Sequence, residues 1–191
     1  DRLGSALARF RLISWLNERM FRLRLPGDYQ YAWRRGWMDL YIDFSKIYAE
    51  FHRRRGIPAT VVPWGTSPRW YANLDLERDI DVLWMGKRRN KRRRELLAQV
   101  RDELDKHGVQ MYFADREENP FIFGEERTQF LNRCKIVLNV KTVWYDNVFS
   151  TRFHMAAGNR ALVVSESFVP HHPAYRDGVH FASAPPEALA E

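Results

Sequence analysis

The sequence predicts an α/β fold in which a parallel, doubly wound sheet carries helices on both faces. Three observations support this prediction. Apolar segments of strand length alternate with segments of helical periodicity, several helical segments are bounded by capping residues or glycines, and 45% of the residues are hydrophobic. A chain of 191 residues can also bury a substantial core. We therefore expect one α/β domain, preceded by a mainly helical N-terminal segment over residues 1–56.

The N-terminal segment opens with a basic amphipathic pattern. Over residues 1–24, apolar residues recur every three to four positions with arginines between them, which is typical of a helix. Such a helix either makes peripheral contact with an anionic membrane surface or packs against the remainder of another domain. We prefer the second interpretation because amphipathic helices are far commoner as core elements.

The next elements follow in order. Residues 37–43 are expected to form a strand, and Ser45 is expected to cap a helix that ends at Gly56. The segment 57–66 is rich in β-forming residues and opens the predicted α/β domain, 57–191, while residues 66–78 resemble a linker.

The remainder alternates between strands and helices. Strands are expected at 81–85, 109–113, 135–140, 161–165 and 179–182, and helices at 90–106, 125–133 and 150–157. Parallel sheets of this kind bind ligands at the carboxyl ends of their strands. The loops at these ends contain Gly86 with residues 87–89, Asp115 with Arg116, residues 139–145 and residues 165–167.

Charge and motifs narrow the class of ligand. The net charge of +7 implies an anionic partner, and basic residues concentrate in residues 1–24, 53–55 and 87–94. The chain has neither a Gly-x-Gly-x-x-Gly fingerprint nor a Walker phosphate loop, which argues against a nicotinamide dehydrogenase and a P-loop NTPase. Its one cysteine, Cys134, excludes a disulfide framework and is expected to be buried.

Several short motifs, in this order and spacing, resemble the C-terminal half of GT-B glycosyltransferases. The similarity is greatest to the group described as glycosyltransferase family 1-like or CgeB-like, and it covers about residues 56–191. The motifs are Pro-Trp-Gly-Thr at 63–66, Asp-Ile-Asp-Val-Leu-Trp-Met-Gly at 79–86, Lys-Ile-Val-Leu-Asn-Val at 135–140, Ser-Thr-Arg-Phe-His at 150–154 and Ala-Leu-Val-Val-Ser-Glu at 161–166.

The resemblance implies a Rossmann-like domain that binds a nucleotide-diphosphate sugar, which the enzyme transfers to an acceptor held mostly in its other half. Residues 1–56 would then be a remnant of the acceptor-side domain. The resemblance also implies a first loop and a later basic residue that meet the diphosphate, and an acidic residue that contacts sugar or ribose. The donor-binding residues implied in this way are Gly86, Lys87, Arg88, Arg152 and Glu166, with Asn139 and Ser150 as additional pocket contacts.

One feature departs from the family pattern. The Glu-x7-Glu pattern of many retaining GT-B enzymes is absent between Arg152 and Glu166, and His154 stands near the place of its first glutamate. The retaining or inverting outcome and the catalytic residues therefore stay open. We expect His154 to be a packed histidine rather than a catalytic base.

The basic candidates also have structural interpretations. Lys87 and Arg88 either contact phosphate or form a solvated helix start, and residues 92–94 are expected to face water. Arg152 either contacts phosphate or forms an ion pair with Glu166. The histidines at 171, 172 and 180 are expected in a surface loop rather than in a metal site.

We expect a cytoplasmic transferase that needs neither a metal nor a cofactor, because positioned cations and helix N-termini can stabilise a diphosphate leaving group. The acceptor is a glycan, a lipid-linked molecule or a protein. The chain starts without methionine and ends just after Pro185-Pro186, so we expect a partial sequence with the general base elsewhere. Two alternatives stay open: a noncatalytic nucleotide-binding or interaction domain, and a basic nucleic-acid-binding module, against which the clustering of arginines at helix starts argues.

Overall fold

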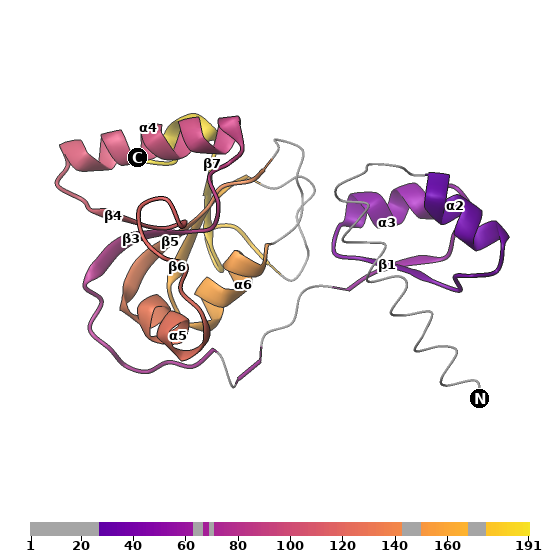
Figure 1. Cartoon of the computed structure of the whole chain (residues 1–191), viewed down its shortest axis with the longest axis horizontal. Coiled ribbons are helices and arrows are strands. Elements are labelled where there is room, and N and C mark those ends of the chain that lie inside the picture. Colours follow the sequence, from indigo (N-terminus) through magenta and orange to yellow (C-terminus); the bar gives the residue numbers. More distant parts are fainter. Residues whose placement is uncertain (1–26, 63–66, 69–70, 143–149, 168–174) are drawn as a thin grey trace. The chain divides into compact units, whose positions relative to one another are not determined.

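The computed structural model describes residues 27–62, 67–68, 71–142, 150–167 and 175–191 (Figure 1). The chain divides into two compact units, Asp1–Pro63 and Trp64–Glu191. Three sequence predictions lie outside the described residues: the basic helix of residues 1–24, the motif at 63–66, and the histidine pair 171–172.

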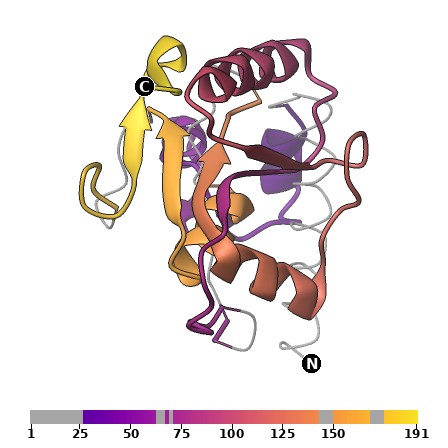
Figure 2. The same cartoon turned by 90° about the vertical axis from the view of Figure 1, so that its left-hand side faces the viewer.

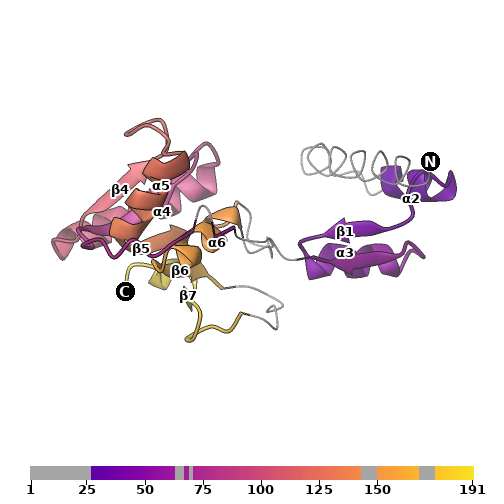
Figure 3. The ribbon, with the colours of Figure 1, turned by 90° about the horizontal axis from the view of Figure 1, so that it is seen from below.

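The first unit contains a β-α-β arrangement. Its described elements are α2 (Gly27–Arg34), β1 (Tyr41–Asp43), α3 (Lys46–Arg53) and β2 (Ala59–Val61). Strands β1 and β2 pair in parallel, with Tyr41 opposite Ala59, and α3 connects them (Figure 3). As predicted, Ser45 caps α3, and its hydroxyl accepts a hydrogen bond from the Tyr48 N–H at 3.4 Å.

Strand β1 begins later than the predicted start at residue 37. Gly36 has a φ of +65°, which allows the Trp37 N–H to donate to the Ala32 carbonyl at 2.9 Å. This is a Schellman-type ending of α2. The closing turn of the helix therefore occupies residues that the apolar pattern assigned to a strand.

The boundary between the units also differs from the prediction, which placed it between residues 56 and 57. Strand β2 pairs with β1 and therefore belongs to the first unit. The apolar segment 57–66 indicates a strand, but it carries no information about the partner, because strand pairing is set by the fold as a whole. The described part of the first unit thus contains two short parallel strands beside its helices α2 and α3.

The second unit is the doubly wound domain that the sequence predicts. Its five strands are parallel and lie in the order β4-β3-β5-β6-β7. Its elements are β3 (Ile80–Met85), α4 (Lys91–Lys106), β4 (Met111–Ala114), α5 (Gly124–Arg133), β5 (Cys134–Asn139), α6 (Thr151–Gly158), β6 (Leu162–Glu166), β7 (Ala182–Ala184) and the short 3₁₀ helix η1 (Pro186–Ala188).

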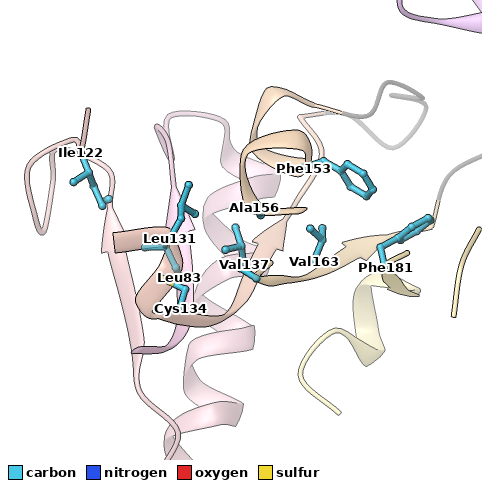
Figure 4. Close-up of a cluster of buried hydrophobic side chains, with 11 residues drawn as sticks. Leu83, Ile122, Leu131, Cys134, Val137, Phe153, Ala156, Val163 and Phe181 are labelled. Atoms are coloured by element: carbon cyan, nitrogen blue, oxygen red, sulfur yellow. The ribbon is translucent and has the colours of Figure 1, made fainter. Parts of the chain in front are cut away.

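Helices cover both faces of this sheet. Helix α4 lies on one face, and α5 and α6 lie on the other (Figures 1 and 2). Residues of β3 alternate between the two layers, so that Val82 and Trp84 pack toward α4 while Leu83 packs toward α5 and α6. Figure 4 shows the second layer, which includes Leu83, Leu131, Cys134, Val137, Phe153, Ala156, Val163 and Phe181.

The last strand lies a few residues beyond its predicted position at 179–182. Asp177 explains the shift, because its carboxylate accepts from the N–H groups of Gly178 and Ser183 and from the Ser183 hydroxyl. Gly178 has a φ of +73°, so the chain turns where an apolar pattern predicted a strand. Among the described helices, none has the length and apolar character needed to cross a membrane.

Candidate functional site

The site lies where the strand order of the second unit reverses. Strand β3 has β4 on one side and β5 on the other, so the chain leaves β3 in one direction and returns on the opposite side. In open parallel sheets, the carboxyl ends of two such strands border the crevice that binds ligands. Here those ends are Met85 and Asn139.

Arg152 joins these two strand ends. Its Nε donates to the Met85 carbonyl at 2.6 Å, and its Nη1 donates to the Asn139 side-chain oxygen at 3.2 Å. Arg152 stands in the first turn of α6, whose predicted cap, Ser150, is confirmed. The Ser150 hydroxyl also donates to the Asn139 side-chain oxygen at 2.6 Å. The helix start and both strands are thereby fixed to one another.

The charge of Arg152 is not balanced by any carboxylate in the described part of the chain. Its side chain contacts a carbonyl, an amide oxygen and the ring of Trp84. Burial, together with nearby Arg93, lowers the pKa of Arg152 to about 9. The guanidinium is therefore still charged at pH 7, and an anion beside it would be favourable.

Gly86 permits this arrangement. Its φ of +127° is a conformation that other residues rarely adopt, and a Cβ atom here would stand 2.9 Å from the Arg152 Nη2. The Gly86 carbonyl accepts a hydrogen bond from the Trp84 indole N–H at 2.6 Å. The glycine that the sequence singled out therefore leaves room for the guanidinium.

A pocket of about 400 Å³ opens at this point, within the size range of small-molecule sites. Its glycine, hydroxyl and cationic lining residues are Gly86, Lys87, Arg127, Ser150, Thr151 and Arg152. Its apolar lining consists of Met85, Ala114, Phe121, Ile122, Phe123 and Met155. Three cations line the pocket, and none of the described lining residues is acidic. Four of the predicted residues, Gly86, Lys87, Ser150 and Arg152, thus come together.

One side of this pocket was not predicted from the sequence. Phe121 and Phe123 follow Pro120 in a strand-end loop, so an aromatic run at that position was a usable signal. Arg127 gave no such signal. It stands in a helix of mixed charge, where the sequence alone does not tell a pocket residue from a solvated one.

Arg88 lies outside the pocket lining. Its guanidinium forms ion pairs with Asp115, with Glu118 at 2.9 Å and with Glu117 at 3.6 Å. It also lies over the Phe113 ring, 4.5 Å from the ring centre. Arg88 and Asp115 are both buried, so this cluster ties the loop after β3 to the loop after β4.

Glu166 is likewise engaged elsewhere. The buried carboxylate forms an ion pair with Arg92 and accepts from the Lys141 backbone N–H at 2.6 Å. The interpretation that Arg152 pairs with Glu166 is therefore wrong, because Arg92 reaches the carboxylate from α4.

The prediction that residues 92–94 face water holds only for the last of them. Arg92 binds Glu166, and the Arg93 Nη2 donates to the Thr142 hydroxyl at 2.6 Å. Arg94 is exposed. The helix start brings two of the three arginines over the strand ends, which a linear charge pattern does not indicate.

The remaining candidates have structural roles. His154 is buried between the rings of Phe153 and Tyr175, as predicted for a packed histidine. Cys134 is buried, and burial raises the pKa of its thiol to about 12. Within the described ranges, no three His, Cys, Asp or Glu side chains gather as a metal site would require.

Comparison with known proteins identifies the fold. No protein-family model and no curated protein matches the chain. Among solved structures, the chain is similar to the pneumococcal O-GlcNAc transferase GtfA in complex with UDP and GlcNAc, with a TM-score of 0.61 and 10% identity. It is also similar to the GtfA/B complex, with a TM-score of 0.55 and 11% identity.

These likenesses cover 83% and 82% of this chain, respectively, and 36% of each solved chain. The chain thus spans about a third of the length of the proteins it resembles. At such low identity, the likeness establishes the fold, which is that of GT-B glycosyltransferases.

Proposed function

We propose that this chain supplies the donor site of a glycosyltransferase, which moves a sugar from a nucleotide-diphosphate sugar to an acceptor. The observation that carries the proposal is the position of Arg152, a cation without a described carboxylate partner at the strand-order reversal. The fold is also that of a solved O-GlcNAc transferase whose structure contains UDP and GlcNAc.

The chemistry of this corner suits a diphosphate. The Nη2 group of Arg152 makes no hydrogen bond to the described residues and lies beside Gly86, which leaves it free to donate to a phosphate oxygen. The first N–H groups of a helix have no acceptor inside the helix. Ser150 accepts from the N–H of Phe153, which leaves those of Thr151 and Arg152 at the pocket. These groups and the helix dipole favour an anion there.

The same groups would assist transfer. As the bond between sugar and diphosphate breaks, negative charge accumulates on the leaving group. Donors that are already positioned stabilise this charge without rearranging during the reaction. Arg152, Lys87 and the start of α6 supply positive charge on the described lining. We therefore propose that the transfer does not depend on a bound metal.

In this proposal, the acceptor and the general base belong to a part of the enzyme outside this chain, which spans about a third of the length of the solved chains it resembles. A glycan, a lipid-linked molecule and a protein are the acceptor classes to examine in the whole protein. The donor site, by contrast, can be tested on the 191-residue chain itself.

The test is calorimetric titration of this chain with UDP, GDP and their sugars. We expect micromolar binding that weakens about tenfold or more in Arg152→Gln, because charge-assisted hydrogen bonds contribute roughly 1.5–3 kcal/mol. Arg94→Gln is the matched control, since Arg94 is exposed and does not line the pocket. Circular dichroism confirms that each variant is folded.

Three results would count against the proposal. A folded chain that binds none of these nucleotides has no donor site of this kind. Tight binding of oligonucleotides with a steep dependence on salt would instead favour a basic nucleic-acid-binding module. Donor binding without turnover in the whole protein would indicate a noncatalytic nucleotide-binding domain.

A further inference from the structure

The pocket has a second end whose composition differs from the corner around Arg152. The segment between β4 and α5 brings Phe121 and Phe123 to the lining, with ring centres 6.1 Å apart and an interplanar angle of 82°. Phe123 is 66% exposed although it is a large apolar side chain. Met155, one turn beyond Arg152 on α6, lines the pocket as well. An exposed aromatic face in a pocket is a surface on which a flat ring can stack.

A cation stands beside these apolar groups. Arg127 follows Phe123 by one helical turn, and its N–H donates to the Phe123 carbonyl at 3.2 Å. Its side chain is partly buried and lines the pocket. Within the described residues, the Arg127 guanidinium makes no hydrogen bond or ion pair, although Glu125 and Glu126 precede it directly. A guanidinium that shares a pocket lining with apolar side chains is suited to a planar ligand with acceptors on its edge.

We propose that this end of the pocket binds the nucleobase of the donor and that Arg127 selects guanine. The inference rests on the proposed donor site and extends it to the identity of the base. Stacking on Phe123 tolerates any base, because every base has a π face. Selection must therefore come from the edge of the base, and Arg127 is the lining cation that lies on α5, next to Phe123.

The hydrogen-bonding groups on the edges of the bases determine the expected order of nucleotide affinities. Guanine presents two neighbouring acceptors, O6 and N7, which match the two parallel donors of a guanidinium. Adenine places an amino donor beside its N7, and cytosine presents an amino donor, so each would oppose the arginine. Uracil offers a single carbonyl on the corresponding edge. The expected affinity for nucleoside diphosphates therefore falls from GDP to UDP and then to ADP and CDP.

Arg127 is assigned to the base rather than to the diphosphate because of where it stands. The phosphate-binding groups come from the end of β3 and the start of α6, namely Gly86, Ser150 and Arg152. Arg127 comes from α5, next to Phe123. A pocket of about 400 Å³ is at the small end of the range for ligand sites, which suits one nucleotide stretched between these two ends.

The test is to titrate the 191-residue chain with GDP, UDP, ADP, CDP and inorganic pyrophosphate, in the unaltered form and as Arg127→Gln. We expect GDP to bind the unaltered chain about tenfold more tightly than UDP, within the range that a bidentate arginine–guanine pair provides. Arg127→Gln should weaken GDP about tenfold, weaken UDP less, and leave pyrophosphate nearly unchanged. Phe123→Ala should weaken all four nucleotides but not pyrophosphate.

The results of these titrations distinguish a failure of the base assignment from a failure of the donor site. If UDP binds as tightly as GDP, or if Arg127→Gln weakens pyrophosphate, the base assignment is wrong. The donor site nevertheless stands as long as Arg152→Gln weakens all of these ligands. If a folded chain binds no nucleotide, both proposals fail. Arg94→Gln again serves as the control for a general change in charge.

Discussion

The guanidinium carbon of Arg152 lies 4.0 Å from the centre of the Trp84 ring. Arg93 lies over the same ring at 5.3 Å. The face of a tryptophan attracts cations, and this attraction is stronger where water is excluded. Trp84 is fully buried and hydrogen-bonded to Gly86, so it offers Arg152 a fixed surface in place of a carboxylate.

Trp84→Phe tests this relationship. The substitution keeps an aromatic face but removes the hydrogen bond to Gly86 and part of the ring, so we expect the free energy of unfolding to fall by roughly 1–3 kcal/mol. Nucleotide affinity should fall as well, but less than in Arg152→Gln. Urea denaturation and calorimetry measure the two effects. Trp37→Phe, at an exposed position in the other unit, should change neither.

Gly86→Ala should impair stability and binding together. The new residue would adopt a strained backbone conformation and crowd the Arg152 Nη2, at a cost of roughly 1–3 kcal/mol. The matched control is Gly108→Ala, because Gly108 also has a positive φ but has open space around it. The control should lose stability but retain affinity. Equal affinity in both variants would show that Gly86 has no role in placing Arg152.

The ion-pair cluster around Arg88 is expected to stabilise the fold without contacting the donor. Arg88→Met would leave Asp115 buried without its partner, which destabilises proteins by about 3–5 kcal/mol. The double variant Arg88→Met/Asp115→Leu should recover much of this loss, because no buried charge is left unpaired. We expect the double variant to bind nucleotide with nearly unaltered affinity. A large loss of affinity in a folded double variant would show that Arg88 contacts the donor after all.

Donor binding should not depend on a divalent metal. Positive charge for the diphosphate comes from Lys87, Arg152 and the start of α6, so a chelator should leave the affinity for GDP and UDP unchanged. Calorimetric titrations with EDTA and with Mg²⁺ compare the two conditions directly. If Mg²⁺ tightens binding more than a few-fold, the diphosphate is held partly by a cation.

His52 should make the stability of the first unit dependent on pH. The ring is buried against Tyr29 and Tyr41, and burial, with a smaller effect of Arg55, lowers the pKa of His52. The unfolded chain therefore binds the proton more readily than the folded one. Stability is full above the unfolded pKa near 6.5 and decreases as the pH falls through the lower folded value.

The measurement is urea denaturation between pH 5 and pH 8, with His52→Gln compared with His107→Gln, an exposed histidine. The first substitution should remove much of the pH dependence, and the second should leave it. Burial raises the pKa of nearby Asp43, whose contribution has the opposite sign: it is full below the unfolded pKa and is lost as the pH rises. A pH dependence that survives in His52→Gln would exclude His52 as its source.

The secondary structure of the second unit could be predicted because the spacing of apolar residues reflects which side of an element is buried. Residues 80–85 form a strand covered on both faces, and Asn90 and Ser150 cap the helices that follow them, all of which local sequence specifies. Strand pairing could not be predicted in the same way. The partner of 59–61 is a neighbour in the fold, and no local pattern identifies it.

The site was predicted in part for the same reason. The rule that ligands bind at strand ends leads to Gly86, whereas Arg152 was predicted only from the resemblance to GT-B glycosyltransferases. The partners of charged side chains could not be predicted from the order of the elements. Arg92 reaches Glu166 across 74 positions of sequence, and nothing local distinguishes that contact from an ion pair with Arg152.

The hydrogen bonds of Arg152 have a thermodynamic consequence for the ligand-free chain. One guanidinium ties β3 to β5 while carrying a charge that no described carboxylate balances, so it imposes an electrostatic penalty at the carboxyl ends of the two strands. An anion that binds there removes the penalty and, by mass action, raises the melting temperature. Thermal shift with nucleotides should thus report occupancy of this corner, and the chain in a cell rich in nucleotides should be more resistant to unfolding than the purified chain in plain buffer.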